Sequence, residues 1–302
     1  MSVDAVLIAG PTASGKSQAA LALAEKIGGV VINADSMQVY REARILTARP
    51  SDEDTARAPH LLYGHVSVAE TYSVGRYQAE AAHALRTARE MDRVPIFAGG
   101  TGMYFGVLTR GIANIPAVPK GARQAAEARR AEIGAEAFHA ELALRDPVAA
   151  ARLRPSDTQR SLRAYEVFEA TGRALSDWQT EMGEAALAQM KLAQFVLSPP
   201  RDLLHARIDA RFDAMMAAGA LDEAKALNDL SPTAAKILGL RELRAATEGA
   251  SPLEFAVEQA KARTRQYAKR QLTWFRHRME EWRWVENGEF SNIVSKIMSE
   301  LD

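Results

Sequence analysis

Short apolar runs alternate with helical patterns over the first hundred residues of the chain. Val3–Ala9, Val30–Ala34 and Val94–Ala98 are almost wholly apolar. Between them, Ser17–Ile27 and Gly75–Glu90 carry apolar residues at helical spacing. Apolar strands separated by helices are typical of a parallel sheet that is covered by helices on both faces. We therefore predict an α/β fold built on a parallel sheet.

After Gly111 the pattern changes to long stretches of Ala, Arg, Glu and Leu, broken by prolines and without a clear strand. Phe195–Ser198 predicts a return to the sheet, and helices are predicted over about 202–218 and Pro252–Trp282. The predicted organisation is a core formed by 1–111 and 195–302, interrupted by an all-helical insertion domain at 112–194.

The composition is that of an ordinary globular protein, with 47% hydrophobic and 25% charged residues among 302. No apolar run reaches the roughly 20 residues of a membrane span, and the first residues lack the features of a signal peptide. The absence of Cys excludes disulfides, thiolate metal sites and a Cys nucleophile.

We expect a cytoplasmic protein with no membrane association. We also expect a monomer without an obligate protein partner, since nothing in the sequence indicates an interface.

The formal net charge is zero, but the charge is unevenly distributed. The stretch 261–283 holds eight basic residues against two acids, Glu280 and Glu281. A basic stripe on a neutral protein indicates a polyanionic partner. The basic residues are Lys261, Arg263, Arg265, Lys269, Arg270, Arg276, Arg278 and Arg283.

The segment after the first apolar run matches the P-loop pattern G-x-x-x-x-G-K-[ST] and lies where that motif belongs, between a strand and a helix. Its N–H groups converge on phosphate oxygens, Lys16 supplies a cation, and the Ser17 hydroxyl is a ligand for Mg²⁺. The core is thus P-loop NTPase-like and phosphate-binding, and by motif nucleotide- or ATP-binding. The predicted diphosphate-binding residues are Gly10, Pro11, Thr12, Ala13, Ser14, Gly15, Lys16 and Ser17.

Asp35 directly follows the second apolar run, so it should face the same crevice as Lys16. A carboxylate there can take a proton from an acceptor, although it could equally cap the following segment or hold Mg²⁺ through water. Gly99-Gly100-Thr101-Gly102, after the third run, either allows close approach of a ligand or forms a tight turn with positive φ.

The third run ends in Ala98-Gly99-Gly100 and not in the acidic residue that helps to hold Mg²⁺ in P-loop ATPases and GTPases. This absence favours a loop that holds a diphosphate leaving group over one that powers a motor or switch.

Several motifs together resemble the tRNA dimethylallyltransferases, also called tRNA isopentenyltransferases. The P-loop is followed by A-D-S-M-Q-V-Y at 34–40 and by G-G-T-G-M-Y at 99–104. D-T-Q-R-S-L-R-A-Y-E-V at 157–167 and T-R-Q-Y-A-K-R-Q-L-T-W-F-R at 264–276 complete the series. The matches are in family order and cover nearly the whole chain. The chain departs from the family at Pro59-His60-Leu61, which has one His instead of two, and at Leu240, where Tyr is usual.

The resemblance implies transfer of a dimethylallyl group from dimethylallyl diphosphate to N6 of the adenine at position 37 of tRNA, next to the anticodon. It implies Mg²⁺ as cofactor, the tRNA anticodon stem-loop as partner, and Asp35 as general base. Lys16, Ser17, Thr101 and Arg211 would act with Asp35 in catalysis. The implied tRNA contacts are Asp35, Ser36, Met37, Gln38, Thr101, Arg123, Gln159, Arg160, Ser161, Leu162 and Arg163. The pattern of the last helix adds Arg265 and Lys269 to these contacts, although such charges can equally form a solvated face.

Three alternatives remain open on the sequence. A small-molecule P-loop kinase would use Asp35 to activate a hydroxyl. A prenyltransferase acting on free adenine nucleotides would not need the basic stripe. A nucleic-acid-binding ATPase switch would bind tRNA in a nucleotide-dependent way without forming a product.

Overall fold

The computed structural model describes residues 3–286 and 290–299. The chain forms two compact units. The first consists of Met1–Thr109 with Ala186–Asp302, and the second of Arg110–Ala185.

The first unit is built around a parallel sheet of six strands in the order β3-β2-β4-β1-β5-β6. Every pairing is parallel, which confirms the predicted α/β fold. Helices enclose the sheet, so its central strands are buried throughout and their sequences are continuously apolar. The strands are β1 Ala5–Ala9, β2 Gly29–Asn33, β3 His60–Leu61, β4 Val94–Gly99, β5 Leu192–Leu197 and β6 Arg283–Val285.

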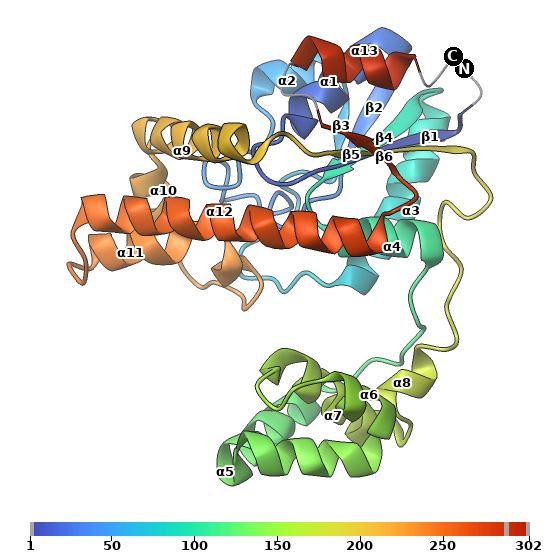
Figure 1. Ribbon diagram of the computed structural model, residues 1–302, viewed down its shortest axis with the longest axis vertical. Helices are drawn as coiled ribbons and strands as arrows, with labels where there is room; N and C mark the ends of the chain where they lie inside the picture. The colour runs from blue at the N-terminus through green and yellow to red at the C-terminus, as the bar shows by residue number, and fades with distance from the viewer. Residues whose placement is uncertain (1–2, 287–289, 300–302) are drawn as a thin grey trace. The chain divides into compact units, whose positions relative to one another are not determined.

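The helix α1, Lys16–Ile27, connects β1 to β2 and packs on the sheet beside α13, Phe290–Met298 (Figure 1). It ends at Gly28, whose φ of 65° allows its N–H to bond Ala24 O. A further layer is formed by α12, Leu253–Arg278, which lies alongside α9, Arg201–Ala217, and α11, Leu240–Thr247. The remaining helices of this unit are α2 Asp52–Arg57, α3 Val74–Glu90, α4 Gly102–Arg110, α10 Ala220–Ala226 and the 3₁₀ helix η1 Ala234–Lys236.

The sequence pattern misplaced one boundary each of β5 and α12 and missed the strands β3 and β6. The strand β5 begins at Leu192, not Phe195. Leu192 and Gln194 are only half-buried, so the start of the strand resembles the polar insertion before it. The helix α12 ends at Arg278 rather than Trp282, and β6 follows it. The short edge strands β3 and β6 were missed, since two or three residues are too few to give a periodicity.

The second unit is helical. Its elements are α5 Lys120–Arg145, which is broken at Gly134, with α6 Pro147–Arg152, α7 Thr158–Thr171 and α8 Leu175–Trp178. Phe138 stacks on Tyr165 with ring centroids 4.6 Å apart, and Leu142 and Leu162 complete the buried centre.

A buried carboxylate, Asp146, ties three of these helices together at the end of α5. It accepts hydrogen bonds from Ala149 N at 2.9 Å, Ser176 N at 3.0 Å and Ser176 Oγ at 2.7 Å. Asp146 therefore caps α6 and fixes α8 against it.

Candidate active site

The predicted phosphate loop connects β1 to α1, and its residues from Ala13 to Ser17 line a cavity. Ala13 and Gly15 have positive φ angles of 62° and 89°. Alternation of left- and right-handed residues turns successive N–H groups toward one point, which is an arrangement that binds anions. A non-glycine residue such as Ala13 in this conformation is strained, as is common in ligand-binding loops. A Cβ on Gly10 would lie 2.5 Å from Ser14 Oγ, so the loop requires glycine there.

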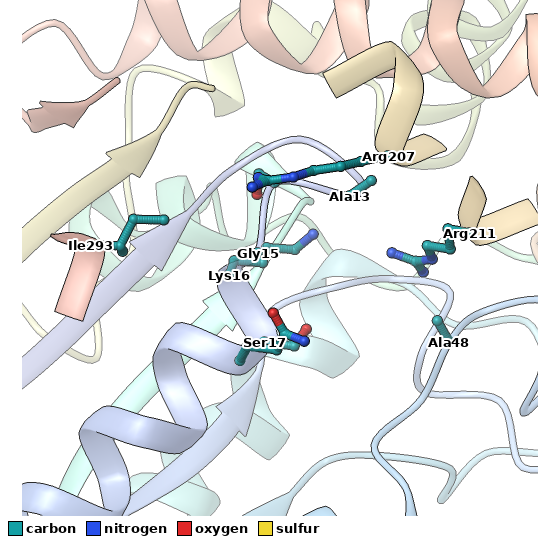
Figure 2. Close-up of a pocket in the computed structure, with 10 residues that line it drawn as sticks. Ala13, Gly15, Lys16, Ser17, Ala48, Arg207, Arg211 and Ile293 are labelled. Atoms are coloured by element: carbon teal, nitrogen blue, oxygen red, sulfur yellow. The ribbon is translucent and has the colours of Figure 1, made fainter. Parts of the chain in front are cut away.

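A cavity of about 500 Å³ opens over this loop (Figure 2). Three cations line it: Lys16 from α1, and Arg207 and Arg211 from α9. The described lining contains no carboxylate, so the cavity suits a polyanion. The full lining is Ala13, Ser14, Gly15, Lys16, Ser17, Gln18, Ala48, Arg207, Arg211 and Ile293.

Burial has made the ammonium group of Lys16 and the guanidinium group of Arg211 costly to charge. It lowers the pKa of Lys16 to about 8, against the opposing effect of Asp35, and nearby Arg211 lowers this pKa further. Burial also lowers the pKa of Arg211, and again the Asp35 carboxylate opposes the change. A bound anion would relieve this cost, so the site favours a multiply charged phosphate group.

The Asp35 carboxylate is held at the end of β2 by a local network. Its N–H donates to Asn33 Oδ1 at 2.8 Å, and Asn33 Nδ2 donates to Asp35 O at 2.9 Å. Asp35 Oδ1 accepts from Met37 N at 3.0 Å. The other oxygen, Oδ2, lies beside Gly100, where a Cβ would be only 3.2 Å from it. One carboxylate oxygen is thus fixed by the backbone, and the other lies beside the β4–α4 loop.

Thr101 joins the Asp35 segment to that loop. Its Oγ1 accepts from Ser36 N at 2.9 Å and donates to Ser36 Oγ at 3.1 Å. Its own N–H donates to Ala34 O. The structure therefore brings Asp35, Ser36 and Thr101 together, on the same side of the sheet as the phosphate loop.

The glycines before and after Thr101 are required by close packing. None has positive φ, so the tight-turn interpretation was wrong. A Cβ on Gly99 would lie 2.0 Å from backbone atoms of Ala34, and one on Gly102 would lie 2.2 Å from the ring of Trp274. These glycines therefore allow a close approach, as one interpretation expected, but the groups that approach them are protein atoms and not a ligand.

Gln38 holds a backbone segment that lines the phosphate cavity. It is buried, and its Nε2 donates to Thr47 O at 3.0 Å and Ala48 O at 2.7 Å. Since Ala48 lines the phosphate cavity, Gln38 shapes that wall. Met37, the residue before it, is half-buried.

Two residues near the loop were missed by the sequence analysis. Arg207 lies one helical turn before Arg211 and lines the same cavity, and the four-residue spacing could have indicated it. Gln271 of α12 accepts from Thr12 N at 3.0 Å and donates to Gly100 O at 2.8 Å. Its motif gave no sign of these contacts, because the partners lie 259 and 171 residues away.

Three of the eight basic residues at 261–283 form ion pairs within the protein. Lys261 binds Asp213 and Glu258, Arg263 binds Glu242, and Arg265 binds Asp209. The prediction of an open basic stripe was therefore too broad.

Lys269 and Arg276 of α12 are exposed and line a groove of about 560 Å³ between α9 and α12. Arg201 and His205 of α9 line the same groove, and none of its described lining residues is acidic. This groove is therefore a basic surface of the first unit that contains part of the stripe.

The residues predicted for tRNA contact in the second unit have unequal exposure. Gln159 and Arg160 are exposed, and Arg160 pairs with Asp157 at 2.7 Å. Ser161 and Leu162 are buried, so their side chains pack inside the helical unit and are not on its surface.

Arg123 and Arg163 share one buried carboxylate, Glu166, at 3.6 Å and 2.8 Å. Arg123 also pairs with Glu127 at 2.7 Å.

Comparison with known proteins identifies this arrangement. Residues 38–278 match the family model described as IPP transferase. The chain is 53% identical to the tRNA dimethylallyltransferase of Nitrobacter hamburgensis, over 98% of this chain and 94% of that one. It is 51% identical to that of a Bradyrhizobium species, over 97% and 96% of the two chains.

Solved structures agree. The tRNA isopentenylpyrophosphate transferase of Bacillus halodurans superposes with a TM-score of 0.69 at 32% identity, over 99% of this chain and 95% of that one. A eukaryotic dimethylallyltransferase acting on tRNA gives a TM-score of 0.76 at 29% identity, over 90% and 69% of the two chains. The sheet with its phosphate loop is thus the P-loop NTPase-like fold of these enzymes, and the chain belongs to the IPP transferase family, among the tRNA dimethylallyltransferases.

Proposed function

We propose that this chain transfers the dimethylallyl group of dimethylallyl diphosphate to N6 of adenine 37 in tRNA. The observation that carries the proposal is the Asp35 carboxylate, whose charge acts on Lys16 and Arg211, two of the three cations that line the cavity. The cations suit a diphosphate, and the carboxylate suits an acceptor that loses a proton as it reacts.

In the proposed reaction, the N6 lone pair attacks C1 of the donor and the C1–O bond to the diphosphate breaks. An adenine amine is too weakly acidic for a carboxylate to deprotonate beforehand. The N6 proton therefore passes to Asp35 as the N–C bond forms. Lys16, Arg211 and the N–H groups of the loop stabilise the charge that gathers on the departing diphosphate. The adenine must leave the anticodon stack to reach the carboxylate.

A divalent cation fits the same site. Prenyl diphosphates generally require one, and we propose Mg²⁺. Among the described residues no cluster of three or more His, Asp or Glu could hold a metal by itself. The exposed Ser17 hydroxyl at the start of α1 lines the cavity, so Ser17 and the donor's own phosphate oxygens would hold the ion, with water completing its shell. When bound, it neutralises diphosphate charge.

We assign the tRNA to two surfaces, one on each unit. The first is the groove between α9 and α12, with Lys269 and Arg276. The second is the exposed part of α5 and α7, with Arg123, Gln159 and Arg163. The proposed role of the helical unit is thus to bind tRNA. The anticodon stem-loop is the proposed ligand. We further propose a cytoplasmic monomer; described residues hold no helix long and apolar enough to cross a membrane.

The test is incubation with radiolabelled dimethylallyl diphosphate and Mg²⁺, without ATP, in the presence of bulk tRNA or of AMP. We expect label in tRNA, and less of it as salt screens the phosphate contacts. Label in AMP instead would make the chain a nucleotide prenyltransferase. ATP consumption on small hydroxylated acceptors, with no label in either substrate, would establish a kinase.

A further inference from the structure

Gln271 lies where the two halves of the proposed reaction meet. Its side chain is buried, with 6% of the residue exposed. Its Oε1 accepts the N–H of Thr12, in the phosphate loop, and its Nε2 donates to Gly100 O, in the loop beside Asp35. One planar amide from α12 thus spans two loops that belong to different strands of the sheet.

The Gly100 end of this bridge lies beside Asp35, the base of the proposed reaction. A Cβ on Gly100 would lie 2.3 Å from Gln271 Nε2 and 3.2 Å from Asp35 Oδ2. The amide nitrogen and the carboxylate oxygen therefore flank the same backbone position. At the other end, Thr12 lies in the loop that holds the diphosphate in the proposed reaction. The bridge links the site of the leaving group to the site of the base.

The chemistry of the bridge requires a carboxamide. One end must accept a hydrogen bond and the other must donate one, and both partners are backbone groups that cannot change their character. A Glu at 271 would place a carboxylate oxygen against the Gly100 carbonyl, and a Leu would leave the Thr12 N–H and the Gly100 carbonyl without partners.

We infer that Gln271 is a positioning residue that fixes the separation between the phosphate loop and Asp35. Transfer requires donor C1, N6 and the base to be aligned, and a displacement of about 1 Å can reduce a rate by on the order of 10²-fold. The inference rests on the proposed function for the meaning of the two sites. The bridge itself is independent of that function.

The first experiment compares Gln271→Glu and Gln271→Leu with the wild type in single-turnover transfer at saturating donor and tRNA. We expect the rate to fall by on the order of 10²-fold, while the Kd values of donor and tRNA change by less than about threefold. Gln259→Glu, on an exposed position of the same helix, is the matched control and should retain the wild-type rate. A wild-type rate in both Gln271 variants, or a loss confined to Kd, would overturn the inference.

The second experiment does not depend on activity. Hydrogen exchange of the intact protein should show faster exchange at residues 10–17 and 99–102 in Gln271→Leu, with an unchanged rate in the helical unit. If the wild type transfers no label to tRNA, the proposed function fails, and this exchange still decides whether the bridge holds the loops. Unchanged exchange at both loops would show that it does not.

A double-mutant cycle tests the contact directly. Gly100→Ala forces a Cβ against the Gln271 amide, whereas in a Gln271→Ala background that collision is absent. We expect the rate loss from Gly100→Ala to be at least about fivefold smaller in the Gln271→Ala background. Additive losses would show that the amide does not occupy the space beside Gly100 during transfer.

Discussion

The two units of the molecule hold their cations in opposite ways. In the first unit, Lys16 and Arg211 are enclosed around the phosphate loop, and neither forms an ion pair with a described residue. In the second, Arg123 and Arg163 lie near the surface and share Glu166. Enclosed cations without a counter-ion are destabilising until an anion arrives, so they favour a small, dehydrated ligand. Paired surface arginines exchange one partner for another, which suits a large hydrated ligand that binds and leaves.

The largest expected effect separates chemistry from RNA binding. Asp35→Asn keeps an acceptor for Met37 N but removes the proton acceptor, so we expect transfer to fall by on the order of 10²–10⁴-fold. The Kd for tRNA, measured by filter binding, should stay within about threefold of the wild type, since no carboxylate is needed to hold the RNA. Near-normal turnover by this variant would remove Asp35 from the role of base.

The next prediction tests whether burial of the Lys16 ammonium group lowers the stability of the protein. Lys16→Met should weaken donor binding by on the order of 10–100-fold, through loss of a charge-assisted contact to phosphate. The same variant should be more stable than the wild type at pH 7, by on the order of 1–3 kcal/mol, because it no longer buries an ammonium group. Donor titration and thermal unfolding measure the two effects, and lower stability of the variant would contradict the comparison.

The pH dependence of stability tests whether burial of the Lys16 ammonium group destabilises the protein. The pKa of Lys16 is about 8 in the folded chain and 10.5 without burial, so between these values the unfolded chain binds more protons. Wild-type stability relative to Lys16→Met should therefore rise as pH increases from about 8 to 10, while affinity for the diphosphate falls. If the free energies of unfolding of the two proteins changed in parallel with pH over this range, the pKa of Lys16 would not be lowered.

A smaller effect should be confined to the helical unit. Asp146→Ala removes the acceptor of three hydrogen bonds and leaves buried donors, so we expect about 2–4 kcal/mol of destabilisation. Exchange protection should be lost in residues 110–185 and retained around the phosphate loop. Glu136→Ala, at an exposed position of the same unit, is the control. Equal loss of protection in both units would show that they unfold together.

The smallest effect opposes a simple charge argument. Glu166→Gln makes the chain more positive, which by itself should strengthen tRNA binding. Because Glu166 holds Arg123 and Arg163 side by side, we expect weaker binding instead, by about three- to tenfold. Glu169→Gln, which removes one of the ion pairs of Arg145, supplies the matched change in charge. Tighter binding by Glu166→Gln would mean that the two arginines need no common partner.

By itself, the sequence determined the local elements and the motif chemistry. Buried parallel strands must be apolar on both faces, so the sequence predicted β1, β2 and β4. It predicted the P-loop because the spacing of the glycines, Lys and Ser is characteristic of phosphate-binding loops. Asp35 followed from its place after a strand. The family resemblance pointed to the reaction and to the tRNA-binding segments, which no periodicity could have supplied.

Only the tertiary structure decided which charges are available and which loops are joined. Lys261, Arg263 and Arg265 looked like an open basic surface until their acidic partners were seen on neighbouring helices. Gln271 is one polar residue in a polar helix, and its role is visible only where α12 crosses two loops far away in the sequence. Ion pairing and hydrogen bonding depend on distances of a few ångström between remote segments. Local spacing along the chain does not contain those distances.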